Sequence, residues 1–182
     1  LHNFCTNELS AFYFDIRKDR LYCDRPDLFE RRATRTVMAH IYECLTIWLA
    51  PTLCFTAEEA WSHRPKGVFE DASSVHLRTF PTLPKTWKND ALATKWQNVA
   101  DVRRVVLGSL EPKRADKTIG SSLEAHPHIY LADDTLSNLD WAEICITSQA
   151  TLHKGAAPAD AFTLNDVAGV GVVFAAAEGG KC

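Results

Sequence analysis

The segment KTIGSSLEA, residues 117–125, separates two different sequence patterns, and the fold class follows from what lies on each side of it. Gly120 and the two serines after it are typical of a helix end and a hinge. Before this segment, apolar residues recur every three or four positions, as in amphipathic helices. After it come short β-like runs, HPHIYLA, EICITS and VGVVFAAA. We therefore expect a mainly α protein, with a helical bundle over residues 1–118 followed by a small α/β module over residues 119–182.

Two helices are expected in the first fifty residues. The first should end near Pro26, which cannot continue the helical hydrogen-bond ladder. The second should end at Ala50, because the residue before Pro51 is biased away from helical dihedrals. Each has an apolar stripe at helical spacing: Leu1, Cys5, Leu9, Phe12 and Ile16 on the first, and Ala33, Val37, Ile41, Leu45 and Trp48 on the second.

Two further helices are expected before the hinge. Thr56 and Glu59 have the spacing of a capping box, which predicts the start of a short third helix. Asn89 or Asp90 can cap a long fourth helix, with one extended piece, SVHLRTF, in the loop before it. At the hinge, Gly120 should adopt a positive φ or allow a close backbone approach, so that Gly120→Val would be destabilising. The inward-facing residues of the fourth helix should be Leu92, Trp96, Val99, Val106 and Leu110.

The composition limits the classes of partner. A net charge of −3 argues against a uniformly basic nucleic-acid binder, and any polyanion should meet the first part, because residues 1–124 hold 18 of the 20 Lys and Arg. No apolar run is long enough for a membrane span, so no membrane partner is expected. The six cysteines are scattered and indicate free thiols in a reducing cytoplasm. Because the chain starts at Leu1, we expect it to be part of a longer protein.

The usual signatures of catalysis and metal binding are absent from the sequence. It contains no nucleophile elbow, phosphate loop or paired metal-ligand motif. His126 and His128 should share one face of a strand as a surface pair, since no third ligand is near in sequence. Asp133 and Asp134 precede an apolar helix and should serve as N-terminal caps. Core packing is the expected role of four tryptophans: Trp48, Trp61, Trp96 and Trp141.

Basic residues gather around the turn between the first two helices. Arg17 and Arg20 are three positions apart on one helix, and Arg31 and Arg35 are four apart on the next, so each pair shares a face. A short turn would bring both pairs to the same end of the bundle, where they would suit phosphate oxygens. Ordinary surface pairing with the acidic residues nearby explains the cluster equally well.

Four blocks, in this order, resemble the C-terminal part of the bacterial isoleucyl-tRNA synthetase family: FYFDIRKDRLYCD, LAPTLCFTAEEAW, KRADKTIGSSLEA and DWAEICITS. The resemblance covers essentially the whole chain. It implies the anticodon-binding helical bundle of a class I aminoacyl-tRNA synthetase, then a small α/β junction. The family charges isoleucine tRNA in the cytoplasm, using ATP with Mg²⁺. The catalytic signature motifs are absent, so this chain itself should bind tRNA, need no cofactor and catalyse nothing.

The resemblance also suggests residue roles. Within RKDRLY, it implies that Lys18 and Arg20 are RNA contacts. Arg17 is a further tRNA-binding candidate, because it begins the charged helix end that should face the anticodon arm. Arg31, Arg35 and Lys117 are added on charge placement alone. The terminal AEGGKC resembles the entry to the family's zinc module, which would make Cys182 the first zinc ligand of a longer protein while leaving no metal bound in this chain.

Two other functions stay open at this point. A non-catalytic helical module for protein interactions would show the same solvated basic helix end. A small-molecule enzyme is disfavoured by the missing motifs. If the resemblance to isoleucyl-tRNA synthetases holds, we expect a monomer that binds isoleucine tRNA and not DNA.

Overall fold

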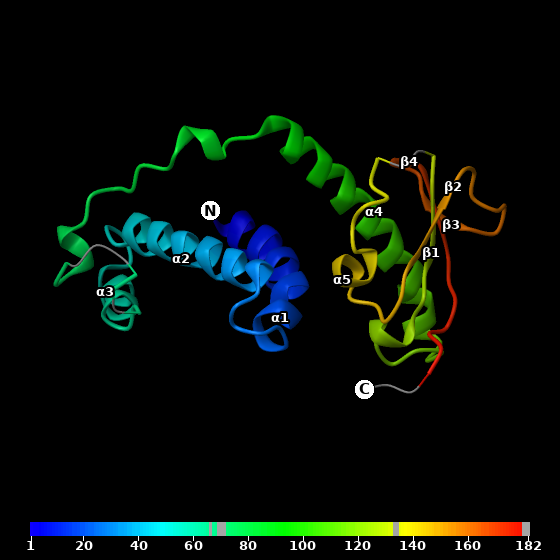
Figure 1. Cartoon of the computed structure of the whole chain (residues 1–182), viewed down its shortest axis with the longest axis horizontal. Coiled ribbons are helices and arrows are strands. Elements are labelled where there is room, and N and C mark those ends of the chain that lie inside the picture. Colours follow the sequence, from blue (N-terminus) through cyan, green and yellow to red (C-terminus); the bar gives the residue numbers. More distant parts are fainter. Residues whose placement is uncertain (66, 69–71, 133–134, 180–182) are drawn as a thin grey trace. The chain divides into compact units, whose positions relative to one another are not determined.

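The computed structural model describes residues 1–65, 67–68, 72–132 and 135–179, and it divides into two compact units, Leu1–Lys88 and Asn89–Cys182. The protein is mainly helical, with one small mixed sheet in the second unit (Figure 1). The division differs from the boundary expected between 118 and 119. The long fourth helix packs on the sheet, so it belongs to the α/β unit rather than to the first three helices.

The first unit is built on two neighbouring helices. A π-helical segment, η1 (Phe4–Phe14), continues into α1 (Asp15–Tyr22), and after a turn α2 (Phe29–Leu49) packs against α1. The helix ends agree with the prediction, but the buried side of α2 does not. Thr34, Cys44, Thr46 and Ile47 are buried, whereas Val37 and Trp48 of the predicted stripe are 44% and 39% exposed.

The remaining elements of the first unit pack beside α2. Helix α3 (Cys54–Ser62) begins two residues before Thr56, and Leu53 provides no side-chain cap, so the predicted capping box is wrong. The predicted extended piece is also wrong at its start. There Ser74 caps a 3₁₀ turn, η2 (Val75–Leu77), and Glu58 accepts hydrogen bonds from the Ser74 hydroxyl and the Val75 N–H. A second 3₁₀ turn, η3 (Lys85–Trp87), ends the unit.

A small core holds α3 to this segment. Trp61 is fully buried with Ile47, Ala50, Ala57 and Val75, as predicted for a core tryptophan. Its indole N–H donates to the Ala72 carbonyl at 3.0 Å. Burying an indole requires such a partner, because an unsatisfied donor would cost free energy. The residues that follow, up to Lys88, are therefore anchored at their start.

The second unit is one helix on a four-stranded sheet. Helix α4 (Asp90–Ala115) begins at Asn89, whose side chain accepts from the Leu92 N–H at 2.9 Å, so the predicted cap is confirmed. The inner side of α4 includes Val99, Val106 and Leu110 as predicted, although Leu92 is 49% exposed. The sheet has the order β2-β1-β4-β3, from β1 (His128–Leu131), β2 (Thr151–Lys154), β3 (Phe162–Leu164) and β4 (Val167–Val173).

Within the sheet, β1 and β2 are parallel and the other neighbours are antiparallel. Ile129 and Val172 point into the core below α4, and Figure 1 shows α4 running along the sheet. Strands were correctly predicted at HPHIYLA and VGVVFAAA. EICITS was wrong as a strand, because Asp140 caps a short helix, α5 (Trp141–Cys145), which ends at Ile146 with a left-handed φ of 55°.

Gly120 does not have the conformation that the sequence predicted. The left-handed residue after α4 is Lys117, with a φ of 62°, while Gly120 is absent from the positive-φ residues and donates its N–H to Glu124 Oε2 at 2.9 Å. A Cβ at Gly120 would meet only the Glu124 carboxylate, at 3.8 Å. The hinge therefore does not depend on glycine at this position. Asp133, Asp134 and Cys182 lie outside the described residues.

Candidate nucleic-acid interface

The turn between α1 and α2 holds two of the predicted basic residues, Arg20 and Arg31, by contacts within the protein. The Arg31 guanidinium donates to the Asp24 backbone carbonyl, and Arg20 forms an ion pair with the Asp24 carboxylate at 3.5 Å. Arg25 pairs with Asp27 at 3.1 Å, with both side chains more than 70% exposed. The short turn thus brings the two basic sets together as predicted, and part of that charge is used to stabilise the turn itself.

The two α1 candidates before the turn differ in their surroundings. Lys18 is exposed, while Arg17 is half-buried. Burial raises the pKa of Tyr13 above its usual value, and the positive charge of Arg17 and a hydrogen bond with Thr34 offset part of that rise. Arg17 therefore lies close to Tyr13 on the packed side of the helix. Of the two, Lys18 is better placed to meet a partner.

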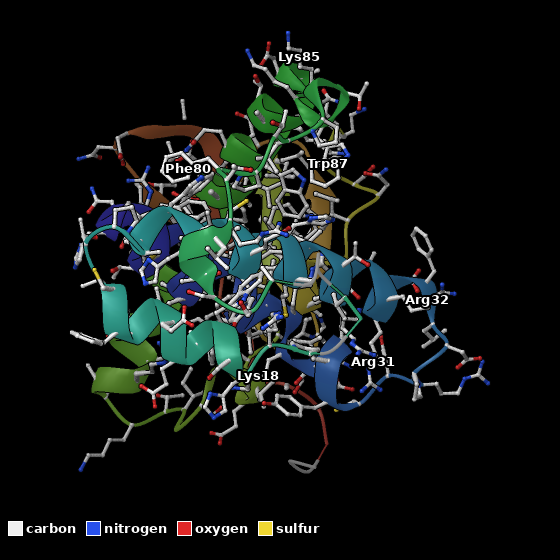
Figure 2. The ribbon with its side chains drawn as sticks, turned by 90° about the vertical axis from the view of Figure 1, so that its left-hand side faces the viewer. Lys18, Arg31, Arg32, Phe80, Lys85 and Trp87 are labelled. Atoms are coloured by element: carbon white, nitrogen blue, oxygen red, sulfur yellow. The ribbon has the colours of Figure 1, made fainter. Side chains whose placement is uncertain are left out.

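An open groove of about 850 Å³ runs along α2 and contains three arginines. Arg32 and Arg35 are exposed, whereas Arg31 is half-buried and its Nε has no hydrogen-bond partner among the described residues. Figure 2 shows Arg31 and Arg32 at the first turn of α2. Guanidinium groups form paired hydrogen bonds with phosphate, so this arginine groove suits a phosphodiester backbone. It is lined by Leu21, Arg31, Arg32, Arg35, Thr36, Met38, Ala39, His40, Tyr42, Glu43, Pro65 and Val68.

Lys117 does not belong to this group of residues. It lies in the second unit, exposed, at the left-handed position after α4. Its backbone N–H donates to the Arg114 carbonyl, which closes the end of the helix. Its backbone therefore has a structural role, and the prediction that its side chain contacts RNA is neither supported nor opposed by the contacts.

Aromatic residues that the sequence interpretation did not select are exposed on the segment before α4. Phe80 is 64% exposed and Trp87 is 56% exposed, and Lys85 precedes Trp87 in the same 3₁₀ turn (Figure 2). The Trp87 ring makes an edge contact with the ring of His40, with centroids 4.9 Å apart. The sequence contained one signal for the exposure of Phe80 and Trp87. Prolines and charged residues flank both, and the segment has no apolar stripe that would predict burial.

A second groove, of about 330 Å³, lies between this segment and α2. It contains the part of the predicted α2 stripe that the fold leaves uncovered. We call it the apolar groove, and it is lined by Phe4, Thr36, Val37, His40, Ile41, Cys44, Leu45, Trp48, Leu83 and Trp87. Contiguous exposed apolar surface can mark an interaction site.

The histidine pair predicted for β1 is present and has a third member. His126 and His128 stack with centroids 4.9 Å apart, and His128 Nδ1 lies 3.0 Å from His153 Nε2 on β2. Burial, and then the neighbouring histidines, lower the pKa of His128. Parallel pairing of distant strands brings His153 to this cluster, which sequence spacing alone could not show.

No metal site accompanies these residues within the described parts of the chain. No group of three or more His, Cys, Asp or Glu side chains there could hold an ion. Cys145 is fully buried, which raises the pKa of its thiol to about 12. The described residues thus do not fit a zinc ion.

Comparison with known proteins identifies the family. The sequence profile described as "Anticodon-binding domain of tRNA ligase" matches residues 1–129. This chain belongs to that family. Isoleucine–tRNA ligases of Agrobacterium fabrum and Bartonella henselae are 53% and 51% identical to it over 186 residues, which cover the whole chain. The match covers 19% of each of those proteins, so the chain spans about a fifth of their length.

The family match and the geometry concern the same residues. The anticodon-binding match includes all of the first unit and α4, and thus every predicted RNA-contact residue. The blocks that resembled isoleucyl-tRNA synthetases are confirmed by relatives bearing that name. Among the described helices, none combines the length and the apolar character that a membrane crossing requires.

Proposed function

We propose that this chain is the part of an isoleucine–tRNA ligase that binds the anticodon arm of isoleucine tRNA. The family match over residues 1–129 carries the proposal. The arginine groove supports it, because its exposed guanidinium groups suit phosphate oxygens. The names of the relatives point to isoleucine as the amino acid.

The proposal extends to the longer protein of which this chain would be a part. That protein attaches isoleucine to its tRNA in the cytoplasm, uses ATP with Mg²⁺, acts as a monomer and does not act on DNA. Its catalytic site lies outside this chain. A zinc module there would begin with Cys182, and none of the described residues is assigned to it. This chain contributes recognition of the RNA and takes no part in the chemistry.

Lys18, Arg32 and Arg35 are the contacts we propose first, because they are exposed around the turn and the groove. Arg20 and Arg31 are proposed to act differently. Their contacts with Asp24 hold the turn, and so they orient the neighbouring cations. Arg17 and Lys117 stay as weaker candidates from the sequence.

The test is a salt titration of tRNA binding by this chain, with a Lys18→Ala variant. Each phosphate contact that is lost should flatten the log–log salt dependence by about 0.7–0.9. Binding should also fall when the isoleucine anticodon is replaced by another. If the wild-type chain shows no salt-dependent binding of either tRNA, the proposal is wrong for this chain, and a protein-interaction role becomes the better explanation of the basic helix end.

A further inference from the structure

The arginine groove and the apolar groove share part of their lining. Thr36 and His40, one turn apart on α2, contribute to both. The arginine groove combines three arginines and Glu43 with aliphatic side chains, whereas the surface of the apolar groove is entirely apolar. Both grooves lie within the first unit. A ligand that crosses from one groove to the other would meet positive charge and then an apolar surface within a few residues.

Trp87 forms the outer wall of the apolar groove and is held in place. The centroids of the His40 and Trp87 rings are 4.9 Å apart, and the ring planes meet at 72° in an edge contact. Pro84 comes before the 3₁₀ turn, and the Trp87 N–H donates to the Pro84 carbonyl at 3.0 Å, which fixes the backbone of the residue. More than half of the side chain is still exposed. A large exposed aromatic ring whose position is fixed loses little conformational entropy when a second ring stacks on it.

We propose that the apolar groove receives one unstacked nucleobase of the anticodon loop, with the Trp87 ring as its stacking surface, while the adjoining phosphates lie along the arginine groove. The inference rests on the proposed function and names the part of the RNA that this site takes. A groove of about 330 Å³ lies at the small end of the range for small-molecule sites, about 300–1,000 Å³.

The chemistry of the two grooves favours a nucleotide over a protein segment. Sequence-specific RNA recognition uses unpaired loop bases that stack on aromatic side chains and bond through their edges. Thr36 and His40 line both grooves, but the surface of the apolar groove is entirely apolar, so a base would be held there by stacking and packing. Lys85, two residues before Trp87 in the same 3₁₀ turn, adds a further cation to this segment. A hydrophobic peptide would fill the apolar groove but would gain nothing from three arginines next to it.

The first experiment measures binding of a fluorescently labelled anticodon stem–loop to the whole 182-residue chain by anisotropy. Trp87→Ala should weaken binding about five- to hundredfold, the range expected for loss of one base–aromatic stack. Trp87→Phe should retain most of the affinity, because it keeps a ring. The matched control is Phe55→Ala, which removes a ring that is 92% exposed. Phe55 lies on α3 near Glu58 and Glu59, so this change should leave the affinity for the stem–loop unaltered.

A second experiment identifies the base by coupling. Loop positions are made abasic one at a time, and each RNA is titrated against wild type and Trp87→Ala. At one loop position, removing the base should weaken binding to the wild-type protein as much as Trp87→Ala does. The same abasic RNA should bind Trp87→Ala no more weakly than the intact RNA does, because the two changes remove the same contact. The salt slope should be the same for Trp87→Ala and wild type, since no charge is lost.

The outcomes separate this inference from the proposed function. If wild type and Trp87→Ala bind the stem–loop equally, the nucleobase site is wrong while tRNA binding stands. The same conclusion follows if every abasic position weakens both proteins alike. If the wild-type chain fails to bind the stem–loop and the intact tRNA, the proposed function fails and the nucleobase site with it.

Discussion

The ion pair between Glu43 and Arg78 should contribute far more to stability than its distance alone would suggest. Arg78 Nη2 lies 2.6 Å from Glu43 Oε1, and the two side chains are only 9% and 15% exposed. The pair connects α2 to the segment that leads to Trp87. Removing one partner of a buried pair leaves the other charge poorly solvated, at about 3–5 kcal/mol. Because both groups retain some exposure, we expect Glu43→Leu to lower the free energy of unfolding of the first unit by about 3 kcal/mol.

A double-mutant cycle tests this reasoning. Arg78→Met alone should also be strongly destabilising, but the double variant should lie within about 1 kcal/mol of wild type, since no buried charge then lacks its partner. Urea unfolding, with hydrogen exchange of α2 peptides to report on the first unit, provides the measurement. Additive losses in the double variant would show that the coupling is absent and that packing, rather than charge, explains the single variants.

The matched control is an exposed pair of the same length. Arg104 Nη1 lies 2.6 Å from Asp166 Oδ2, with side chains 49% and 64% exposed. Water screens such a pair, so Asp166→Asn should leave the free energy of unfolding of the second unit nearly unchanged. Arg104 also pairs with Asp101 at 3.2 Å, so Asp166→Asn leaves it both a partner and solvent. A loss as large as that of Glu43→Leu would contradict the argument from burial.

Three other predictions concern the second unit. The pKa of His128 is lowered in the folded protein, so the unfolded chain binds the proton more readily. The free energy of unfolding should therefore fall as the pH drops below about 6.5. His128→Gln should reduce that fall, as measured by urea titrations at pH 7.5 and 5.5. Gly171→Ala should cost about 1–3 kcal/mol, because its Cβ would lie 2.4 Å from the Ala157 Cβ, whereas Gly120→Ala should be nearly neutral in the same assay. Cys145, with a thiol pKa of about 12, should resist iodoacetamide in the native protein while the exposed Cys54 reacts, as read by mass spectrometry.

Local signals in the sequence were sufficient for several parts of the fold. Pro26 and Pro51 mark real helix ends, Asn89 caps α4, and alternation identified β1. Each of these depends on a residue and its immediate neighbours, so a single sequence contains the information. The same is true of the turn that brings the basic pairs together, because its shortness alone fixes which helix ends meet.

Long-range packing explains the predictions that failed. EICITS has the composition of a strand, but Asp140 caps it and Trp141 buries its ring under α4, so tertiary contacts select a helix. Hydrophobic periodicity located α2 but not its buried side, because both sides carry apolar residues. Gly120 was chosen from residue type, although the left-handed position went to Lys117 three residues earlier. The Asp140 cap was a local signal that the strand prediction overlooked, whereas the buried side of α2 is set by distant contacts.

The near-neutral charge of the chain makes the arrangement of its side chains more important than its composition. With a net charge of −3, long-range attraction of RNA is weak, and part of the basic cluster is already paired with Asp24 and Asp27. Under the proposed function, recognition of the RNA would then depend on short-range contacts whose positions are fixed. α2 would supply them, because it lines both the arginine groove and the apolar groove, with His40 in each lining. A helix with the same composition in another order would keep the charge and lose the site.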